Sequence, residues 1–440
     1  MKYGFPEIRP FVIKFNSSQI VRNGEVFTRI LISFFVILVF GFTNESYGQN
    51  SAQLNASNNL VQTPPMGWNS WDTFMSGISD KLLRQVADAM VTNGMRDAGY
   101  QYINIDDGWA LPNRVNGHLQ PDPKKFPNGF KPITDYLHAR GFKFGIYSDR
   151  GTRTCVTTAP GSYGFETTDA NDFVSWGVDY LKYDNCNPAL MTTQEGDYRR
   201  MQEALLATGR PIVFSICAWE FKSWMPSIGN LWRTTGDITD NWNTIINNID
   251  KNEKSAQYAG PGRWNDPDML VVGCFNVQDL QHNHVLDGTT DLVGNKGLSD
   301  DENIAQFSMW AMMASPLLAS NDVIHMVEKI RKILTNEEVI AVDQDPLGIQ
   351  GVKVWENGKG LFVYSKTLKG LNVKAVALFN RSDNDAEITA KWVDVGIPKE
   401  AATVRDLWKH TDIGIFTDSY KAYVPSHGVV LLKIISTTDK

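Results

Sequence analysis

The feature that most constrains the fold is an alternation of short apolar segments with helix-like segments, repeated eight times between residues 65 and 334. Each apolar segment ends in polar or acidic residues, and a stretch with helical periodicity or a short connection follows it. The predicted strands are residues 66–71, 100–109, 142–149, 178–186, 211–219, 231–237, 263–270 and 315–322. The predicted helices lie near residues 80–97, 132–140, 168–176, 195–208, 242–252, 300–313 and 324–334.

Eight strand–helix units within this length predict a parallel (β/α)₈ TIM barrel. The alternative is an open, doubly wound sheet. Two observations favour the barrel. The first predicted strand is not followed by a glycine-rich phosphate-binding loop, and polar residues end nearly every strand instead of gathering at one switch point. In a barrel all these strand ends converge on one face, where the active site lies.

After residue 347 the pattern changes to short strands with alternating apolar residues, separated by Gly, Asn and Asp turns. This pattern predicts a C-terminal antiparallel β-sandwich domain. The chain is therefore divided into an N-terminal extension with a signal peptide (residues 1–50), a catalytic barrel (63–346) and a sandwich (347–440).

The N-terminus has the layout of a secretory signal. Arg29 precedes an apolar run at residues 30–42, and small and polar residues follow as far as Gly48. The run is shorter than the roughly 20 apolar residues of a membrane-spanning helix. It predicts export, to the periplasm or outside the cell, without stable membrane insertion after cleavage. An uncleaved membrane anchor is the alternative.

Composition excludes some classes of partner. The formal net charge is −7 and no tract of basic residues occurs, which argues against nucleic acid as a partner. The 13 tryptophans are many for this length, and they suggest flat apolar surfaces for a ligand as well as a large core. The sequence does not indicate an oligomeric state.

Acidic residues stand at most of the predicted strand ends. An aspartate after a strand often caps the next helix, and the structural interpretation of Asp149 and Asp322 is helix capping or loop structure. Asp184 and Asp237 differ from these, because each follows a cation closely. Lys182 lies two residues before Asp184 and therefore on the same side of the strand, where it is expected to keep the carboxylate ionised.

Two acids on different strands of one barrel face, without a metal-binding motif, favour glycoside hydrolysis. One carboxylate attacks the sugar and the other carboxyl group gives a proton to the leaving oxygen. The adjacent Asp106 and Asp107 are suited to accept hydrogen bonds from two neighbouring hydroxyl groups. No cofactor is predicted. The expected stacking surfaces for sugar rings are Trp68, Trp71, Trp109, Trp219 and Trp264.

Six motifs in order, "PPMGWNSW", "NIDDGW", "GIYSDRGTRTC", "LKYDNC", "RWNDPDML" and "QDPLG", resemble glycoside hydrolase family 27, the melibiase-type α-galactosidases, over residues 63–440. The resemblance implies a retaining exo-glycosidase that removes terminal α-D-galactosyl residues from oligosaccharides or polysaccharides. It implies Asp184 as the nucleophile, Asp237 as the general acid/base and a disulfide between Cys155 and Cys186. The sugar contacts that it implies are Trp71, Asp106, Asp107, Tyr147, Lys182, Arg233 and Asp268.

One motif departs from the family pattern. Ala218 in "CAWE" stands where galactose-specific members carry a Glu beside the sugar 2-hydroxyl. A small residue there resembles the α-N-acetylgalactosaminidases, but Phe221 replaces their second small residue. The alternatives are therefore activity on α-N-acetylgalactosaminides or β-L-arabinopyranosides, or a non-catalytic galactoside-binding protein. Cys217 and Cys274 are expected to be free and buried.

The segment at residues 276–296 is longer than the corresponding connection in most relatives and follows the seventh strand, at the expected rim of the active site. It contains His282 and His284, with Asp279 and Asp287 nearby. Two histidines in a polar loop are more often exposed to solvent than bound to metal, so no metal ligand is predicted.

Overall fold

The structure is a computed structural model that describes residues 59–156, 159–275, 277, 297–398 and 401–437. The chain separates into two compact units, Met1–Leu54 and Asn55–Lys440, and every described residue belongs to the second. The predicted signal region and, apart from residue 277, the predicted loop at residues 276–296 lie outside the described residues.

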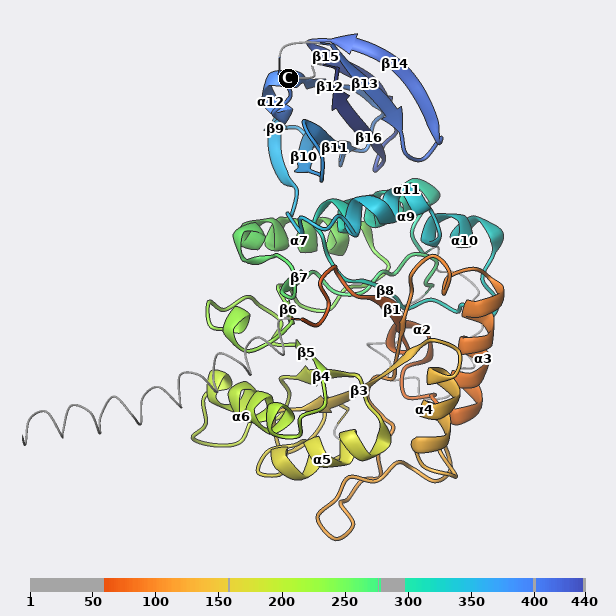
Figure 1. Ribbon diagram of the computed structural model, residues 1–440, viewed down its shortest axis with the longest axis vertical. Coiled ribbons are helices and arrows are strands. Elements are labelled where there is room, and N and C mark those ends of the chain that lie inside the picture. The colour runs from red at the N-terminus through yellow and green to blue at the C-terminus, as the bar shows by residue number, and fades with distance from the viewer. Residues whose placement is uncertain (1–58, 157–158, 276, 278–296, 399–400, 438–440) are drawn as a thin grey trace, which may run out of the picture. The chain divides into compact units, whose positions relative to one another are not determined.

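The barrel is a sheet of eight parallel strands in the order β7-β6-β5-β4-β3-β2-β1-β8 (Figure 1). Between β8 and the segment that follows β7, Leu270 forms a parallel bridge with Ala319 and closes the ring. The prediction of a (β/α)₈ barrel is therefore confirmed. The strands are β1 (Met66–Asn69), β2 (Tyr102–Asn104), β3 (Lys143–Asp149), β4 (Tyr180–Asp184), β5 (Val213–Ile216), β6 (Leu231–Arg233), β7 (Trp264–Asp266) and β8 (Leu317–Ala319).

Helices lie around the outside of this sheet (Figure 1). They are α2 (Trp71–Phe74), α3 (Asp80–Thr92), α4 (Lys131–His138), α5 (Glu166–Trp176), α6 (Gln194–Ala207), α7 (Trp242–Asn252), α9 (Asp300–Met312), α10 (Glu328–Leu334) and α11 (Glu337–Asp343), with the 3₁₀ turns η1 (Met225–Ser227) and η2 (Glu253–Tyr258).

Polar side chains begin several of these helices. Ser79, Thr193, Asn241 and Ser299 each accept a hydrogen bond from a backbone N–H group in the first turn of the helix that follows. These bonds satisfy donors that have no partner within the helix. Gly177 ends α5 in a left-handed conformation that few other residues adopt without cost.

Some helix boundaries differ from the prediction for identifiable reasons. The helix predicted at residues 80–97 ends at Thr92, because the chain turns at Gly94, whose φ is +87°. The helix predicted from residue 324 begins at Glu328, because the Asp322 carboxylate holds the N–H groups of Ile324 and His325 in a turn. The short helices α2 and α11 were not predicted.

The C-terminal part is the predicted antiparallel β-sandwich. A six-stranded sheet has the order β14-β13-β16-β11-β10-β9, and β12 pairs with β15 in a second sheet. The strands are β9 (Val352–Glu356), β10 (Leu361–Thr367), β11 (Val373–Asn380), β12 (Ala386–Lys391), β13 (Ala401–Asp406), β14 (Thr411–Thr417), β15 (Ser419–Val424) and β16 (Val429–Ser436), with the short helix α12 (Trp392–Val395). Residues 63–346 and 347–440 remain the proposed extents of the two domains.

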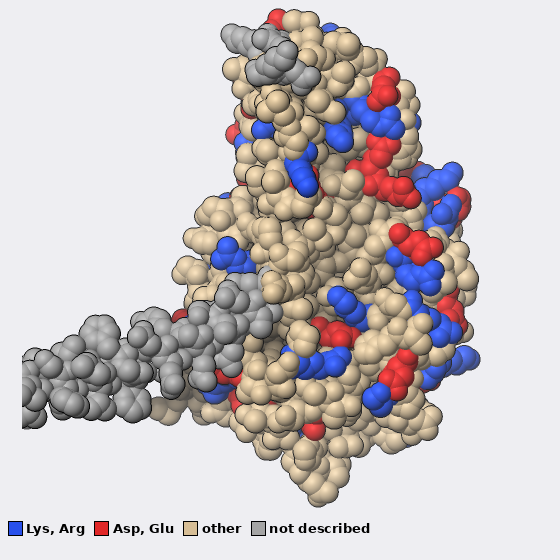
Figure 2. All heavy atoms as spheres, viewed as in Figure 1, with Lys and Arg blue, Asp and Glu red and all other residues tan. Residues whose placement is uncertain are grey.

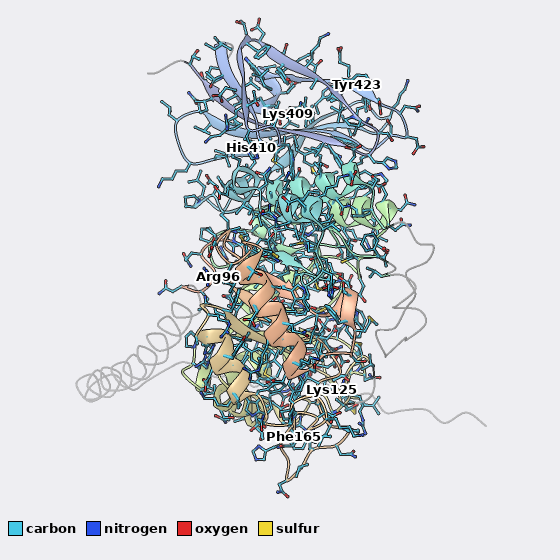
Figure 3. All side chains as sticks on the ribbon, turned by 90° about the vertical axis from the view of Figure 1, so that its right-hand side faces the viewer. Arg96, Lys125, Phe165, Lys409, His410 and Tyr423 are labelled. Atoms are coloured by element: carbon cyan, nitrogen blue, oxygen red, sulfur yellow. A yellow bond between two sulfur atoms is a disulfide. The ribbon has the colours of Figure 1, made fainter. Side chains whose placement is uncertain are left out.

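Charged and aromatic side chains join the sandwich to the barrel helices. Arg405 on β13 forms two hydrogen bonds of 2.7 Å with Glu338 on α11, and His410 contacts the same carboxylate at 2.8 Å. Figure 3 shows His410 on the side of the sandwich next to the barrel helices. The Trp408 indole N–H donates to Ser308 on α9 at 2.9 Å.

Basic and acidic side chains are intermixed on the face of the molecule shown in Figure 2, and neither sign gathers into a large patch there. Of the helices in the described part of the chain, none combines the length and the apolar content that a membrane crossing requires.

Gly67 on β1 tests the close packing of the barrel strands. A Cβ atom at this position would lie 2.5 Å from the backbone oxygen of Tyr102, which the β1–β2 ladder holds in place. Gly67→Ala should therefore lower the free energy of unfolding by about 1–3 kcal/mol, the usual cost of overpacking. Denaturant unfolding measures this loss. Gly260→Ala is the matched control, since its Cβ would meet nothing within 4 Å. Equal stability of the two variants would contradict the packing at Gly67.

Candidate active site

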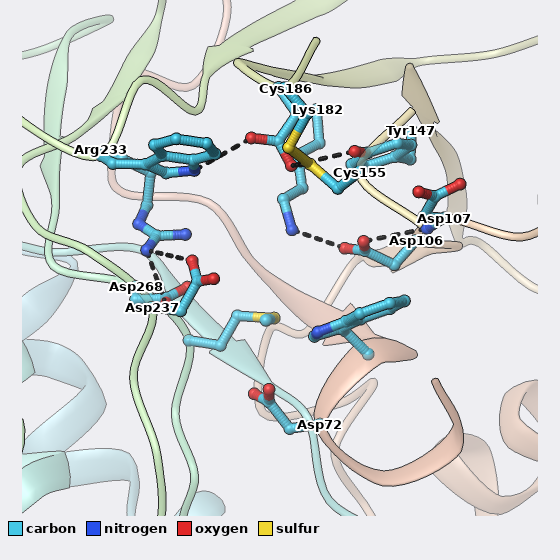
Figure 4. Close-up of a pocket in the computed structure, with 14 residues that line it drawn as sticks. Asp72, Asp106, Asp107, Tyr147, Cys155, Lys182, Cys186, Arg233, Asp237 and Asp268 are labelled. Atoms are coloured by element: carbon cyan, nitrogen blue, oxygen red, sulfur yellow. Dashed lines mark hydrogen bonds and ion pairs between the residues drawn. A yellow bond between two sulfur atoms is a disulfide. The ribbon is translucent and has the colours of Figure 1, made fainter. Parts of the chain in front are cut away.

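The two predicted catalytic acids, the seven sugar contacts that the resemblance implies and Trp219 all line one cavity of about 140 Å³ at the carboxyl ends of the barrel strands (Figure 4). The cavity is small, with space suited to a single sugar residue. Cys155 and Cys186 also line it, as do two residues that the sequence analysis missed, Asp72 and Met269. Each of the two directly follows a residue that was predicted, which was the only signal for them in the sequence.

Asp106 and Asp107 lie side by side after β2 and are both buried. Asp106 accepts hydrogen bonds from Lys182 Nζ at 2.7 Å and from Asn69 Nδ2 at 3.0 Å. Asp107 accepts the N–H group of Val156 at 3.1 Å. Burial is the main cause that raises the pKa of Asp107 to about 6. The pair therefore offers a cation-bound carboxylate beside a second carboxyl group that is partly protonated in mildly acidic solution.

Asp184 ends β4, and donors hold both oxygen atoms of its carboxyl group. The Tyr147 hydroxyl donates to Oδ2 at 3.0 Å, and the Trp219 indole N–H donates to Oδ1 at 3.1 Å. The backbone N–H of Asn185 also donates to Oδ1, at 2.9 Å. These bonds fix the orientation of the carboxyl group and favour its charged form.

Lys182 lowers the pKa of Asp184, as expected, but its ammonium group forms its ion pair with Asp106. The pKa of Asp184 lies above its usual value, with burial as the largest cause. Lys182 still lowers it, but Asp237 and Asp106 raise it further. The sequence pattern placed the lysine on the correct side of β4 and did not show that its partner acid follows β2, two strands away in the sheet.

Arg233 at the end of β6 binds two acids. Its Nη2 atom lies 3.0 Å from Asp237 Oδ1 and 2.9 Å from Asp268 Oδ2 (Figure 4). Burial acts to raise the pKa of Asp237, but Arg233 and Lys182 together outweigh it, so the pKa is lowered. The Asp237 side chain is 62% exposed, so solvent weakens both effects, and the direction rests on the bond with Arg233. Arg233 therefore favours the carboxylate form of Asp237.

The disulfide that the resemblance implies, between Cys155 and Cys186, is present in the structure. Asp149 holds the same region by accepting the backbone N–H groups of Gly151 at 2.6 Å and Cys186 at 2.8 Å, which agrees with its structural interpretation. Donor atoms of Asp149, Asp184 and the two cysteines lie within 4.8 Å of one another. Both sulfur atoms are in the disulfide, so they are not available as thiolate ligands for a metal.

Three of the five expected stacking surfaces are wrong. Trp68, Trp109 and Trp264 are buried in the core with at most 3% of their surface exposed. Their indole N–H groups donate to backbone carbonyl groups. Trp71 and Trp219 line the cavity, so they alone of the five are placed to contact a sugar.

Ala218 and Phe221 do not line this cavity. Both line a neighbouring one, and the centre of the Phe221 ring lies 4.5 Å from that of the Tyr258 ring.

Cys217 and Cys274 are free and buried, as expected. The Cys217 sulfur accepts a hydrogen bond from Arg233 Nη1 at 3.6 Å, and this contact helps to hold the guanidinium group in position.

Asp72 is an unusual member of the cavity lining. It is 1% exposed, and neither carboxyl oxygen has a hydrogen-bond partner. Its pKa is raised well above the usual value, chiefly by burial and then by Asp268. Because a buried, unpaired carboxylate is costly, these surroundings favour the neutral acid. Asp72 therefore adds a carboxyl group to the cavity without adding a full charge.

Comparisons with known proteins agree with this geometry. The family model described as "Alpha galactosidase A" matches residues 63–287 and 283–345, and the one described as "Alpha galactosidase C-terminal beta sandwich domain" matches residues 358–434. An α-galactosidase of Oryza sativa subsp. japonica is 45% identical over 380 residues, which cover 84% of this chain and 85% of the relative.

Solved structures show the same similarity. The crystal structure of α-galactosidase I from Mortierella vinacea matches with a TM-score of 0.78 and 35% identity, over 87% of this chain and 100% of that chain. The structure of an α-galactosidase from Saccharomyces cerevisiae with raffinose matches with a TM-score of 0.75 and 28% identity, over 87% and 99%. The chain therefore belongs to the α-galactosidase A family, glycoside hydrolase family 27, and it is a glycoside hydrolase.

Proposed function

We propose that this chain is an exo-acting, retaining α-galactosidase. The observation that carries the proposal is one small cavity that holds Asp184, Asp237 and the Asp106–Asp107 pair. Two positively charged side chains, those of a lysine and an arginine, lie in the same cavity. A cavity of this size suits one terminal sugar, and two acids in different electrostatic surroundings suit double displacement. The α-galactosidase names of relatives at 45% identity support the same activity.

In the first step, an Asp184 oxygen attacks the anomeric carbon and forms an ester with the galactosyl group. The bond from that carbon to the leaving oxygen breaks, and Asp237 gives its proton to that oxygen. In the second step, Asp237 takes a proton from water, and the water oxygen attacks the anomeric carbon. The ester breaks, which releases galactose and restores the Asp184 carboxylate.

The hydrogen bonds around Asp184 prepare it for attack. The Tyr147 hydroxyl and the Trp219 indole N–H stabilise the carboxylate that burial disfavours. Asp237 starts from the opposite situation, because Arg233 favours its carboxylate form. We infer that only molecules that have protonated Asp237 and ionised Asp184 react, so activity should fall on both sides of an acidic optimum.

The remaining cavity residues are assigned to recognition of the sugar. Asp106 and Asp107 are proposed to accept the axial 4-hydroxyl and the 6-hydroxyl of galactose, as the resemblance implies. Trp71 provides an aromatic surface for the C–H face of the ring. The relative from Saccharomyces cerevisiae has been solved with raffinose. Terminal α-galactosides of this kind are the proposed substrates.

Galactose is favoured over N-acetylgalactosamine at this site. Ala218 alone suggests space for a 2-acetamido group, but it lines the neighbouring cavity and not the catalytic one. Trp219 occupies the corresponding wall of the catalytic cavity and is bonded to Asp184. We therefore propose that Trp219, and not a residue at position 218, bounds the space beside the 2-position.

Export is proposed as well. The layout of residues 29–48 is that of a secretory signal. The disulfide between Cys155 and Cys186 supports this proposal, since disulfides persist mainly in oxidising compartments.

Nitrophenyl glycosides test the proposed activity. Hydrolysis of 4-nitrophenyl α-galactoside should be faster than that of the α-N-acetylgalactosaminide or the β-L-arabinopyranoside, as measured by kcat/KM. Faster cleavage of either of the other two would replace the proposed substrate. Binding of galactose without cleavage of any of the three would indicate a non-catalytic protein.

Asp184→Asn tests the nucleophile. The amide has nearly the same shape but cannot form the ester, so kcat should fall by several orders of magnitude while galactose still binds. A 2-fluoro galactosyl fluoride should label Asp184 in the native enzyme, as located by peptide mass mapping. Asp97→Asn, an exposed substitution with the same charge change, should keep full activity. A label on another acid would contradict the assignment.

Tyr147→Phe tests the pH dependence. Removal of the hydroxyl deletes a bond that favours the charged form of Asp184, so the pKa of Asp184 should rise. Because the pKa of Asp184 lies above that of Asp237, the alkaline side of the kcat/KM profile reports Asp184 and should move to higher pH, while the maximum falls because fewer molecules combine ionised Asp184 with protonated Asp237. Tyr423→Phe on the sandwich, 68% exposed, is the matched control and should leave the profile unchanged (Figure 3). An unchanged profile in Tyr147→Phe would show that the hydroxyl does not control this ionisation.

A further inference from the structure

The ring of helices is interrupted after β5. The 14 residues between β5 and β6 form only the 3₁₀ turn η1, in place of a helix. A cavity of about 610 Å³ lies beside this connection. Its lining includes Trp219 and Glu220 from this connection, Asn185 directly after β4 and Gln194 at the start of α6. Lys251 at the end of α7 and Lys254 on η2 also line it. We call this cavity the lysine cleft.

Trp219 lines both the lysine cleft and the catalytic cavity. Its φ is +63°, a strained conformation for a bulky residue that persists where the surroundings require it. The indole N–H is bonded to Asp184, and 38% of the residue remains exposed. The ring is therefore a common wall between the site of bond cleavage and the cleft.

The position of the cleft relates it to the leaving part of the substrate. In the proposed reaction, Asp184 attacks the anomeric carbon, to which the leaving group is attached. The leaving group departs on the opposite face, beside the general acid Asp237, and Thr234, from the segment that joins β6 to Asp237, lines the cleft together with Trp219. The catalytic cavity, about 140 Å³, suits one sugar, whereas the cleft is about 610 Å³. A leaving group that extends beyond Asp237 toward Thr234 and Trp219 enters the lysine cleft.

The cleft differs from the catalytic cavity in its charge. Within the described part of the chain, neither Lys251 nor Lys254 forms an ion pair with a carboxylate. Glu220 is the one acid in the lining, and its carboxylate is 2.6 Å from Lys222 Nζ. The two lysines are therefore not neutralised by an acid of the cleft, and both ammonium groups are exposed to whatever enters it.

The acids nearest to these lysines in the sequence are bound elsewhere. Asp250 is 2.5 Å from Arg381 Nη1 of the sandwich, and Glu253 is 3.5 Å from Lys353 Nζ. The sandwich thus provides the cations that pair with these two carboxylates, which are the nearest acids to Lys251 and Lys254 in the sequence. The contact between the two domains leaves a positive charge on the cleft side of α7.

We propose that the lysine cleft is a subsite for the leaving part of the substrate, and that Lys251 and Lys254 select leaving groups that carry a carboxylate. The class of substrate is an acidic glycan with terminal α-galactosyl residues. This inference rests on the proposed α-galactosidase activity and adds a specificity to it. Lysine is suited to this selection as a point charge on a flexible chain, which accepts carboxylates in several positions.

The test uses two substrates that share one leaving oxygen. Oxidation of the reducing end of α-galactosyl-(1→6)-glucose gives an aldonic acid, and reduction gives an open-chain alditol. The two differ by a carboxylate in place of a hydroxymethyl group. The wild-type KM for the acid should be about two- to fivefold lower than for the alditol, the effect of partly exposed ion pairs. The difference should shrink at high salt.

The double variant Lys251→Ala/Lys254→Ala should bring the ratio of the two KM values close to one, and Lys251→Glu/Lys254→Glu should reverse it. A loss of stability cannot produce that reversal, which matters because Lys251 also lies in the last turn of α7. The control is Lys359→Ala/Lys369→Ala, at exposed positions on the sandwich. It makes the same change in net charge and should keep the wild-type ratio.

A wild-type ratio near one, or the same ratio in the control and both cleft variants, would overturn the proposal while alditol hydrolysis still confirms the α-galactosidase activity. Failure to cleave either substrate or 4-nitrophenyl α-galactoside would instead overturn the proposed function, and this inference with it.

Discussion

Six carboxyl groups share one cavity with the cationic side chains of Lys182 and Arg233, and the rest of the site depends on how these charges are balanced. Burial favours the neutral form of each acid. Lys182 stabilises the charge on Asp106, and Arg233 divides its guanidinium between Asp237 and Asp268. Asp184 has no cation of its own and relies on three N–H and O–H donors. The proposed nucleophile is thus kept reactive by dipoles, while the proposed proton donor is kept near a cation.

The parallel strands bring these groups together. The register pairs Tyr147 with Lys182 and Asp149 with Asp184 on neighbouring strands, so residues far apart in the chain end at the same level of the barrel. The disulfide and Asp149 then fix the loops beyond β3 and β4. The fold therefore sets the position of the carboxylates, and the loops set their orientation, as pre-organised catalysis requires.

The fold and the members of the site could be predicted because both follow from position along the strands. Alternation of strands and helices indicated the barrel, and the acids at strand ends indicated the cavity. The partners of charged groups could not be predicted, because Lys182 on β4 binds Asp106, which follows β2, rather than Asp184 on its own strand. Trp68, Trp109 and Trp264 were misassigned because a residue at a strand end can point into the core as readily as into the site. Asp72 was missed because an acid in the first turn of a helix looks like an ordinary helix start.

The central claim is that Asp184 and Asp237 act as a retaining pair, which requires their carboxyl groups to lie about 5–5.5 Å apart, without room for an attacking water. The stereochemistry of the first product tests this claim most directly. Proton NMR during rapid hydrolysis of 4-nitrophenyl α-galactoside should show α-galactose appearing first, followed by slow mutarotation to the β-anomer. If β-galactose appears first, water attacks the sugar directly, and the proposed double displacement through Asp184 is wrong.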